Sequence, residues 1–186
     1  MTCIRLFTLG VLFGSSFCTA QLRDQRYNLA FEYIANSPRT KNDVIPSLVG
    51  EDSSKVTLPI SINVSPKLQQ LRFSNFPSVY MCLHPGLSMQ AVSDSMTVLS
   101  REEHTLANID SSSSELASFS NSKSPMYNLY FTVIRSNKLV AILYPKLPSD
   151  RIATSRLINA CTFFFLFTAE GTIEKVYCSV TTLNLD

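Results

Sequence analysis

The sequence is short of glycine, histidine and cysteine, the residues around which many catalytic and metal sites are built. Of its five glycines, only Gly50, Gly86 and Gly171 follow residue 20, which excludes a glycine-rich loop that cradles phosphate groups. The two histidines, His84 and His104, have no metal-ligand spacing to a cysteine or to a second histidine. The sequence therefore predicts no catalytic residue, no cofactor and no metal ion.

A strong charge of one sign is also missing. The chain has 16 basic and 14 acidic residues, which gives a net charge of +2. Nucleic acids and anionic membranes bind proteins through clustered lysine and arginine. We therefore expect no nucleic-acid partner, and the partner we do expect is a protein or a surface.

The longest apolar run lies at the N-terminus, in MTCIRLFTLGVLFGSSFCTA. Arg5 is followed by about a dozen apolar residues, and Cys18 to Ala20 are small, which is the pattern of a secretory signal peptide. The run is too short for a membrane-spanning helix, which needs roughly 20 apolar residues. We expect a signal peptide over 1–20, a single domain over 21–186 without a membrane span, and a periplasmic, cell-surface or secreted location.

Cysteine is scarce once the signal is removed, because only Cys82, Cys161 and Cys178 follow residue 20. So few cysteines do not make a disulfide scaffold, and their odd number leaves at least one thiol unpaired or intermolecular. This composition fits a bacterial periplasm or surface better than a small animal secreted module.

The first half of the domain shows one helix and one strand. Tyr27, Phe31 and Ile34 share one face of a helix over 22–36, and a polar linker is expected from there through Gly50 to Ser54. Residues 56–65 alternate strictly between apolar and polar, which predicts a strand, and Pro59 places it at or near a sheet edge.

The middle of the chain is less clear. Ser65 and Pro66 suit the start of a short helix, and 87–99 fits either a helix or a strand. Ser100 and Glu103 have capping-box spacing, which predicts another helix start. Residues 111–125 are rich in serine and are expected to form a polar surface loop.

Two hairpins are predicted in the second half. Strands 128–135 and 138–144 would join at Ser136-Asn137 and pair Phe131 near Ile142 and Val133 near Val140. The second hairpin, 161–182, turns near Gly171. Its apolar residues 163–167 do not alternate, so both faces of that strand should be covered and the strand should be central.

The turn near Gly171 decides how the cysteines of CTFFFLFTAEGTIEKVYC lie. A four-residue turn places Cys161 opposite Cys178, a two-residue turn places Phe163 there, and a three-residue turn places Thr162 there. Glycine suits the last position of a three-residue turn, which would put the two cysteines on opposite faces. We therefore expect unbridged, half-buried thiols.

Two weak patterns could carry hydrolytic chemistry. Cys82 and His84 would share one side of a strand, and Gly86-Leu-Ser88-Met-Gln90 begins like a nucleophile elbow but has Gln90 in place of the second glycine. A half-buried cysteine and a loop histidine explain the first pattern better. The missing glycine removes most of the second.

Two segments, YNLAFEYIANSPRTK and FFFLFTAEGTIEKVYCSV, together resemble a loose group of small exported proteins from Bacteroidetes whose function is not established. Those proteins combine an early tyrosine-rich helix with a closing hairpin. The resemblance implies a cell-envelope location and a one-domain α+β fold, and it transfers no functional residue.

The residues thus predict an α+β fold, with an N-terminal helix packed on an antiparallel sheet of about four to six strands that ends in two hairpins. The function we expect is that of an exported, non-enzymatic cell-envelope protein that acts through binding or assembly. One alternative is a small-ligand carrier with a pocket between helix and sheet, lined by residues such as Phe31 and Phe165. The other is a hydrolase that uses Cys82 or Ser88 with His84 or His104.

The signal-peptide expectation can be tested by expressing the full chain in a secretory bacterial host. The exported protein should begin at Gln21, because Cys18 to Ala20 carry the small residues that a signal peptidase reads. Intact-mass measurement of the exported fraction checks this. An exported product that retains residues 1–20 would contradict it.

Overall fold

A computed structural model describes residues 16–50, 53–70, 72–105, 111–112, 114–146 and 157–184. The longer helices are α1 (Ser16–Asn36) and α4 (Met89–Thr105), and the short ones are α2 (Ile45–Val49), α3 (Pro77–Leu83) and α5 (Ser114–Ala117). The strands are β1 (Ile62–Gln69), β2 (Ser111–Ser112), β3 (Tyr127–Thr132), β4 (Lys138–Pro145), β5 (Leu157–Phe167) and β6 (Ile173–Asn184). Three single turns of other helix types complete the described elements: Thr40–Val44, Ser53–Lys55 and Phe73–Asn75.

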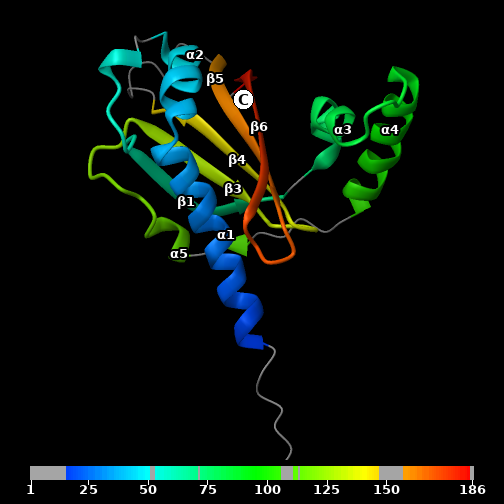
Figure 1. Cartoon of the computed structure of the whole chain (residues 1–186), viewed down its shortest axis with the longest axis horizontal. Helices are drawn as coiled ribbons and strands as arrows, with labels where there is room; N and C mark the ends of the chain where they lie inside the picture. Colours follow the sequence, from blue (N-terminus) through cyan, green and yellow to red (C-terminus); the bar gives the residue numbers. More distant parts are fainter. Residues whose placement is uncertain are drawn as a thin grey trace, which may run out of the picture.

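The strands form one six-stranded sheet in the order β2-β1-β3-β4-β5-β6. Its pairs are antiparallel except for β1 and β3, which run parallel. Helix α1 lies on one side of β5 and β6, while α3 and α4 lie on the other side (Figure 1). The predicted α+β class with an N-terminal helix on the sheet is confirmed, and the sheet is mixed rather than wholly antiparallel.

Helix α1 supplies the predicted apolar face to the main core. Tyr27, Phe31 and Ile34 are buried there together with residues of the sheet. The Tyr27 ring lies edge-on to Phe131, and its hydroxyl donates a hydrogen bond to the carbonyl oxygen of Thr132 at 3.1 Å. The helix ends at Asn36, as the following Ser37-Pro38 predicts.

The polar linker expected after α1 is wrong. Residues Thr40–Val44 form a π-helical turn that leads directly into α2. Val44, Ile45 and Leu48 are buried in the main core. These three apolar residues lie in a segment too short to show a clear helical period. The sequence pattern therefore did not reveal this second element that covers the sheet.

Strand β1 begins later than predicted and continues through the expected helix start. Ile60, Ile62 and Val64 are buried as the alternation predicts, but Leu58 is exposed and precedes the strand. At Ser65-Pro66 the chain stays extended, and the register with β3 shifts between Val64 and Leu68. Because the main-chain nitrogen of proline cannot join a ladder, the irregularity coincides with Pro66.

The serine-rich segment 111–125 is structured along the outer side of β1 rather than being a plain surface loop. Ser120 Oγ accepts a hydrogen bond from the Val64 main-chain N–H at 2.9 Å, and Asn121 Oδ1 accepts one from Ile62 at 2.8 Å. Leu116 is buried, and Phe119 stacks on Phe31. These side chains take the place of a neighbouring strand, a role that composition alone does not reveal.

The β3–β4 hairpin has the predicted turn but not the predicted register. Ser136 and Asn137 both have positive φ, and Arg135 bridges Lys138 across a two-residue turn. Farther from the turn, Phe131 pairs with Ala141 rather than Ile142. The register changes by one residue at Thr132. There the Thr132 Oγ1 accepts a hydrogen bond from the Val140 main-chain N–H at 3.0 Å.

The β5–β6 hairpin shows the same combination. Gly171 has φ 85° at the last position of the turn, and Thr168 N–H donates to the Thr172 carbonyl at 2.9 Å, which confirms the three-residue turn. A further irregularity between Leu166 and Phe167 moves the register by one residue, so Phe163 faces Cys178 instead of Thr162. Bulges of this kind are decided by packing and leave little trace in sequence.

Helix α4 resolves the ambiguous region 87–99 as helix. It begins one residue after Ser88, whose hydroxyl accepts a hydrogen bond from the Ala91 main-chain N–H at 3.2 Å. The helix start predicted at Ser100 is therefore wrong, because Ser100 lies inside α4. The end of that predicted helix and the helical turn expected after Ser149 lie outside the described residues.

We expect Thr132→Val to lower the free energy of unfolding by about 1–3 kcal/mol, because it leaves the buried Val140 N–H without an acceptor. Thr132→Ser keeps the hydroxyl and should cost only about 0.8 kcal/mol for one methyl group. Urea denaturation followed by circular dichroism measures both. Equal decreases in the free energy of unfolding for the two variants would show that this hydrogen bond does not stabilise the shifted register.

Candidate functional site

The site lies between α3 and the face of the sheet opposite α1. Pro77 is at the first turn of α3, where its fixed φ favours a helix start. Val79 packs against Val140 of β4 and Phe164 of β5 in a small second core. Phe76, just before the helix, places its ring edge-on to Phe164 with centroids 5.8 Å apart.

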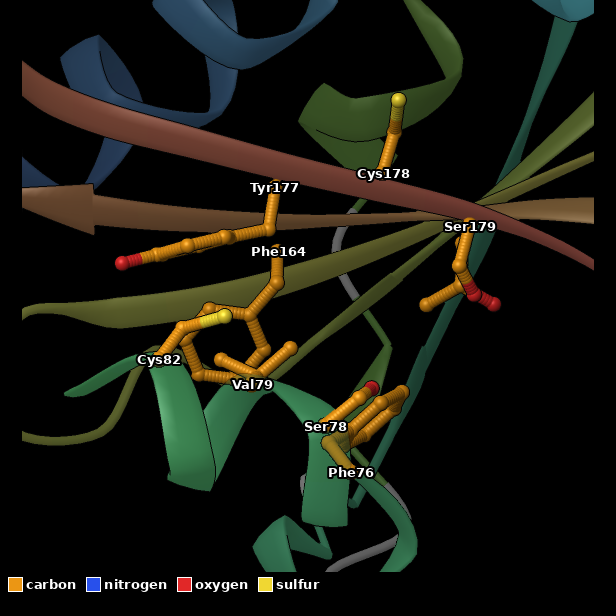
Figure 2. Close-up of a pocket in the computed structure, with 9 residues that line it drawn as sticks. Phe76, Ser78, Val79, Cys82, Phe164, Tyr177, Cys178 and Ser179 are labelled. Carbon is orange, nitrogen blue, oxygen red and sulfur yellow. The ribbon is translucent and has the colours of Figure 1, made fainter. Parts of the chain in front are cut away.

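Next to this contact is a cavity of about 240 Å³, here called the α3 pocket. Its walls come from α3 with the residue before it and from neighbouring positions of β5 and β6 (Figure 2). The lining residues are Phe76, Ser78, Val79, Cys82, Thr162, Phe164, Tyr177, Cys178 and Ser179. Aromatic and aliphatic walls with a few polar groups are typical of small-ligand pockets, and this volume is slightly below the usual ~300–1,000 Å³.

The pocket has two polar ends and an apolar middle. Thr162 pairs with Ser179 across β5 and β6, and Phe164 pairs with Tyr177 two residues along. Figure 2 shows Ser179 toward one end of the pocket, whereas Cys82 and the Tyr177 hydroxyl lie toward the other. The described lining contains no acidic or basic residue.

A cation lies beside the Tyr177 end. The ammonium group of Lys175 is 5.0 Å from the centroid of the Tyr177 ring. The hydrogen bond with Tyr177 raises the Lys175 pKa, and charge interactions with Tyr177, Cys82 and Glu174 raise it further. Lys175 therefore presents a positive charge beside Tyr177, one of the lining residues.

The three cysteines after residue 20 differ in position, and all three are free thiols. Cys82 is exposed at the pocket, Cys161 is buried, and Cys178 is half-buried. In Figure 2 the Cys178 sulfur points away from the other lining side chains, consistent with its packing against the main core. The prediction of unbridged cysteines is confirmed.

The predicted placement of Cys161 and Cys178 on opposite faces is wrong. Because Phe163 pairs with Cys178, Cys161 is the diagonal neighbour of Cys178 on the α1 side of the sheet. Burial raises the pKa of the Cys161 thiol to about 12, and interaction with Cys178 contributes to the increase, while Arg39 opposes it. Cys161 is therefore a protonated thiol at neutral pH.

The candidate nucleophiles have other surroundings than the sequence predicted. Cys82 lies in α3 and His84 is its C-cap, so the two do not share one side of a strand. The His84 ring is 4.5 Å from the Tyr80 ring, and Ser88 caps α4. No hydrogen bond joins Cys82 or Ser88 to His84, and the side chain of His104 lies outside the described part.

The position expected for a ligand pocket, between Phe31 and Phe165, is occupied by packed rings. Phe31 stacks on Phe119, and Phe165 contacts the rings of Tyr33, Phe163 and Phe167. The α3 pocket is instead on the opposite face of the sheet. Sequence reasoning missed Ser78, Lys175 and Tyr177 because their proximity depends on the shifted register of β5 and β6.

Among the described residues, no three histidine, cysteine or acidic side chains are grouped to hold a metal ion. Within those limits, too, no helix is both long and apolar enough to span a bilayer.

No protein-family model, curated protein or solved structure matches the chain. The resemblance to exported Bacteroidetes proteins therefore stays a prediction, and function has to be argued from the residues of the site.

We expect iodoacetamide at pH 8 to modify Cys82 first, Cys178 more slowly and Cys161 only after unfolding. Cys82 is exposed, whereas Cys161 is buried and its raised pKa keeps it protonated until the pH approaches about 12. Intact-mass measurement with time follows the adducts. The Cys82→Ser variant should lose the fast adduct, and rapid modification of Cys161 in the folded protein would contradict the structure.

Proposed function

We propose that this chain is an exported, non-enzymatic protein of the cell envelope, and that it acts by binding a small ligand in the α3 pocket. The observation that carries the proposal is the pocket itself, an apolar cavity of about 240 Å³ beside Phe164 and Tyr177. Its aromatic walls leave room for a small guest between α3 and the sheet. This proposal joins binding as the general activity with the small-ligand carrier considered from the sequence.

Export is supported by the N-terminal sequence and is compatible with the position of α1. Tyr27, Phe31 and Ile34, through which this helix packs in the main core, all follow Ala20, so cleavage after Ala20 would leave these contacts in place. Loss of the signal would shorten α1 by the turn or so before Gln21.

The contacts that the candidate nucleophiles make favour binding over hydrolysis. A serine or cysteine nucleophile needs a base within hydrogen-bond reach. Ser88 instead accepts the main-chain hydrogen bond that starts α4, and His84 lies against Tyr80. Cys82 lies within α3 and His84 is its C-cap, and no hydrogen bond joins the thiol to the imidazole.

Indole, a small neutral aromatic probe, tests whether the pocket admits a guest. Titration followed by amide NMR should shift the signals of residues 76–82, 162–164 and 177–179, which surround the pocket. The Ser78→Phe variant places a ring in the pocket from an exposed position. It should therefore lower the affinity for indole, measured from these shifts, by at least about ten-fold.

The matched control for this variant is Ser93→Phe, because Ser93 is an exposed serine in α4 that does not line the α3 pocket. It should bind indole as the unchanged protein does. If the pocket signals do not move in the unchanged protein, or if both variants lose binding equally, the α3 pocket is not a ligand site.

A further inference from the structure

The apolar part of the α3 pocket is built mainly from rings. Phe164 forms the floor and is almost completely buried, while Phe76 and Tyr177 are half-buried at the sides. The edge-on contact of Phe76 with Phe164 shows that rings meet here in the geometry that aromatic quadrupoles favour. A flat aromatic guest uses the same geometry, which gives it an advantage over an alkyl chain of equal area.

The two polar ends of the pocket differ in charge. At one end, Lys175 supplies an ammonium group over Tyr177, and the described lining has no carboxylate to neutralise it. Glu174 interacts with Lys175, but as its neighbour on β6 it is directed to the opposite face of the sheet. At the other end, Thr162 and Ser179 supply neutral hydroxyl groups that donate or accept hydrogen bonds.

The spacing between these ends matches one aromatic ring with a short side arm. Lys175 and Ser179 are four residues apart on β6, which corresponds to about 13 Å between their backbone positions. The cavity volume of about 240 Å³ holds a guest of roughly ten non-hydrogen atoms at the density of protein interiors. A guest of this size cannot fill the pocket and also carry a long chain.

We propose that the α3 pocket binds a small aryl carboxylate. Its ring lies against Phe76 and Phe164, its carboxylate meets Lys175, and a hydrogen-bonding substituent on the far side of the ring meets Thr162 and Ser179. This inference rests on the proposed binding function and adds the chemical class of the ligand. The anionic group is assigned by the Lys175 ammonium beside Tyr177, and the ring by the aromatic walls.

Four probes of similar size separate the contributions. They are 3-(4-hydroxyphenyl)propanoate, its methyl ester, 4-hydroxyphenethylamine and 3-phenylpropanoate, each titrated calorimetrically at pH 7. The hydroxylated acid should bind with a Kd of about 10 µM to 1 mM, as expected for so small a ligand. Removal of the charge or the hydroxyl should each weaken binding by about five-fold, and the amine should bind least.

Variants of the protein then assign these differences to residues. Lys175→Met should bring the acid and the ester to equal affinity, because the side chain is exposed and its charge is what distinguishes them. Lys123→Met, which changes an exposed lysine outside the pocket, should leave the preference intact. Ser179→Ala should bring the hydroxylated and unsubstituted acids together.

The results distinguish this inference from the binding function itself. If indole moves the pocket signals but the acid binds no better than the ester or the amine, the ligand class is wrong and the pocket remains a binding site. A preference for the acid that survives in Lys175→Met also overturns the inference. If neither indole nor any of the four probes binds at the pocket, both proposals fail.

Discussion

Burial of β5 on both of its faces is the constraint on which the rest of the structure depends. Phe163, Phe165 and Phe167 point to one side of the sheet and Phe164 to the other, and all four are at most 3% exposed. Each such ring contributes about 1.5–3 kcal/mol when it leaves water. A sheet with rings on both faces needs cover on both, which α1 and α2 supply on one side and α3 on the other.

The two covers are unequal, and this inequality creates the pocket. On the α1 side a long helix, the helical turns after it and the segment ending at Phe119 fill the space between side chains. On the opposite side α3 has seven residues and covers Phe164 chiefly through Val79 and Phe76. The edge of this small contact is therefore where aromatic surface stays reachable, beside the one cation of β6 that projects to that side, Lys175.

The sequence was sufficient for the elements whose apolar pattern is regular. The buried face of α1 at Tyr27, Phe31 and Ile34 follows from helical spacing, and the doubly covered β5 follows from its unbroken apolar run. The turns at Ser136-Asn137 and Gly171 follow from residues that tolerate positive φ. These are local properties, which depend on residues that are close together in the sequence.

What could not be predicted depends on contacts between distant segments. The Thr132 hydroxyl that replaces a strand partner, and the irregularity beside Leu166, each move a register by one residue. The one-residue step between β5 and β6 places Tyr177 opposite Phe164 and brings Cys161 and Cys178 to the same face. The candidate site is built from these pairings, so its residues could be recognised only after the register was known.

The side chains of Ser120 and Asn121 on β1 have a consequence for how copies of this sheet can associate. They occupy main-chain groups that a further strand would need on that side, whereas β6 ends the described sheet without a strand on its outer side. Pairing through an open edge joins two sheets, but continued growth requires a second open edge on every copy. Among the described residues the sheet therefore offers a partner strand a long edge at β6 and, at its other end, only the two residues of β2.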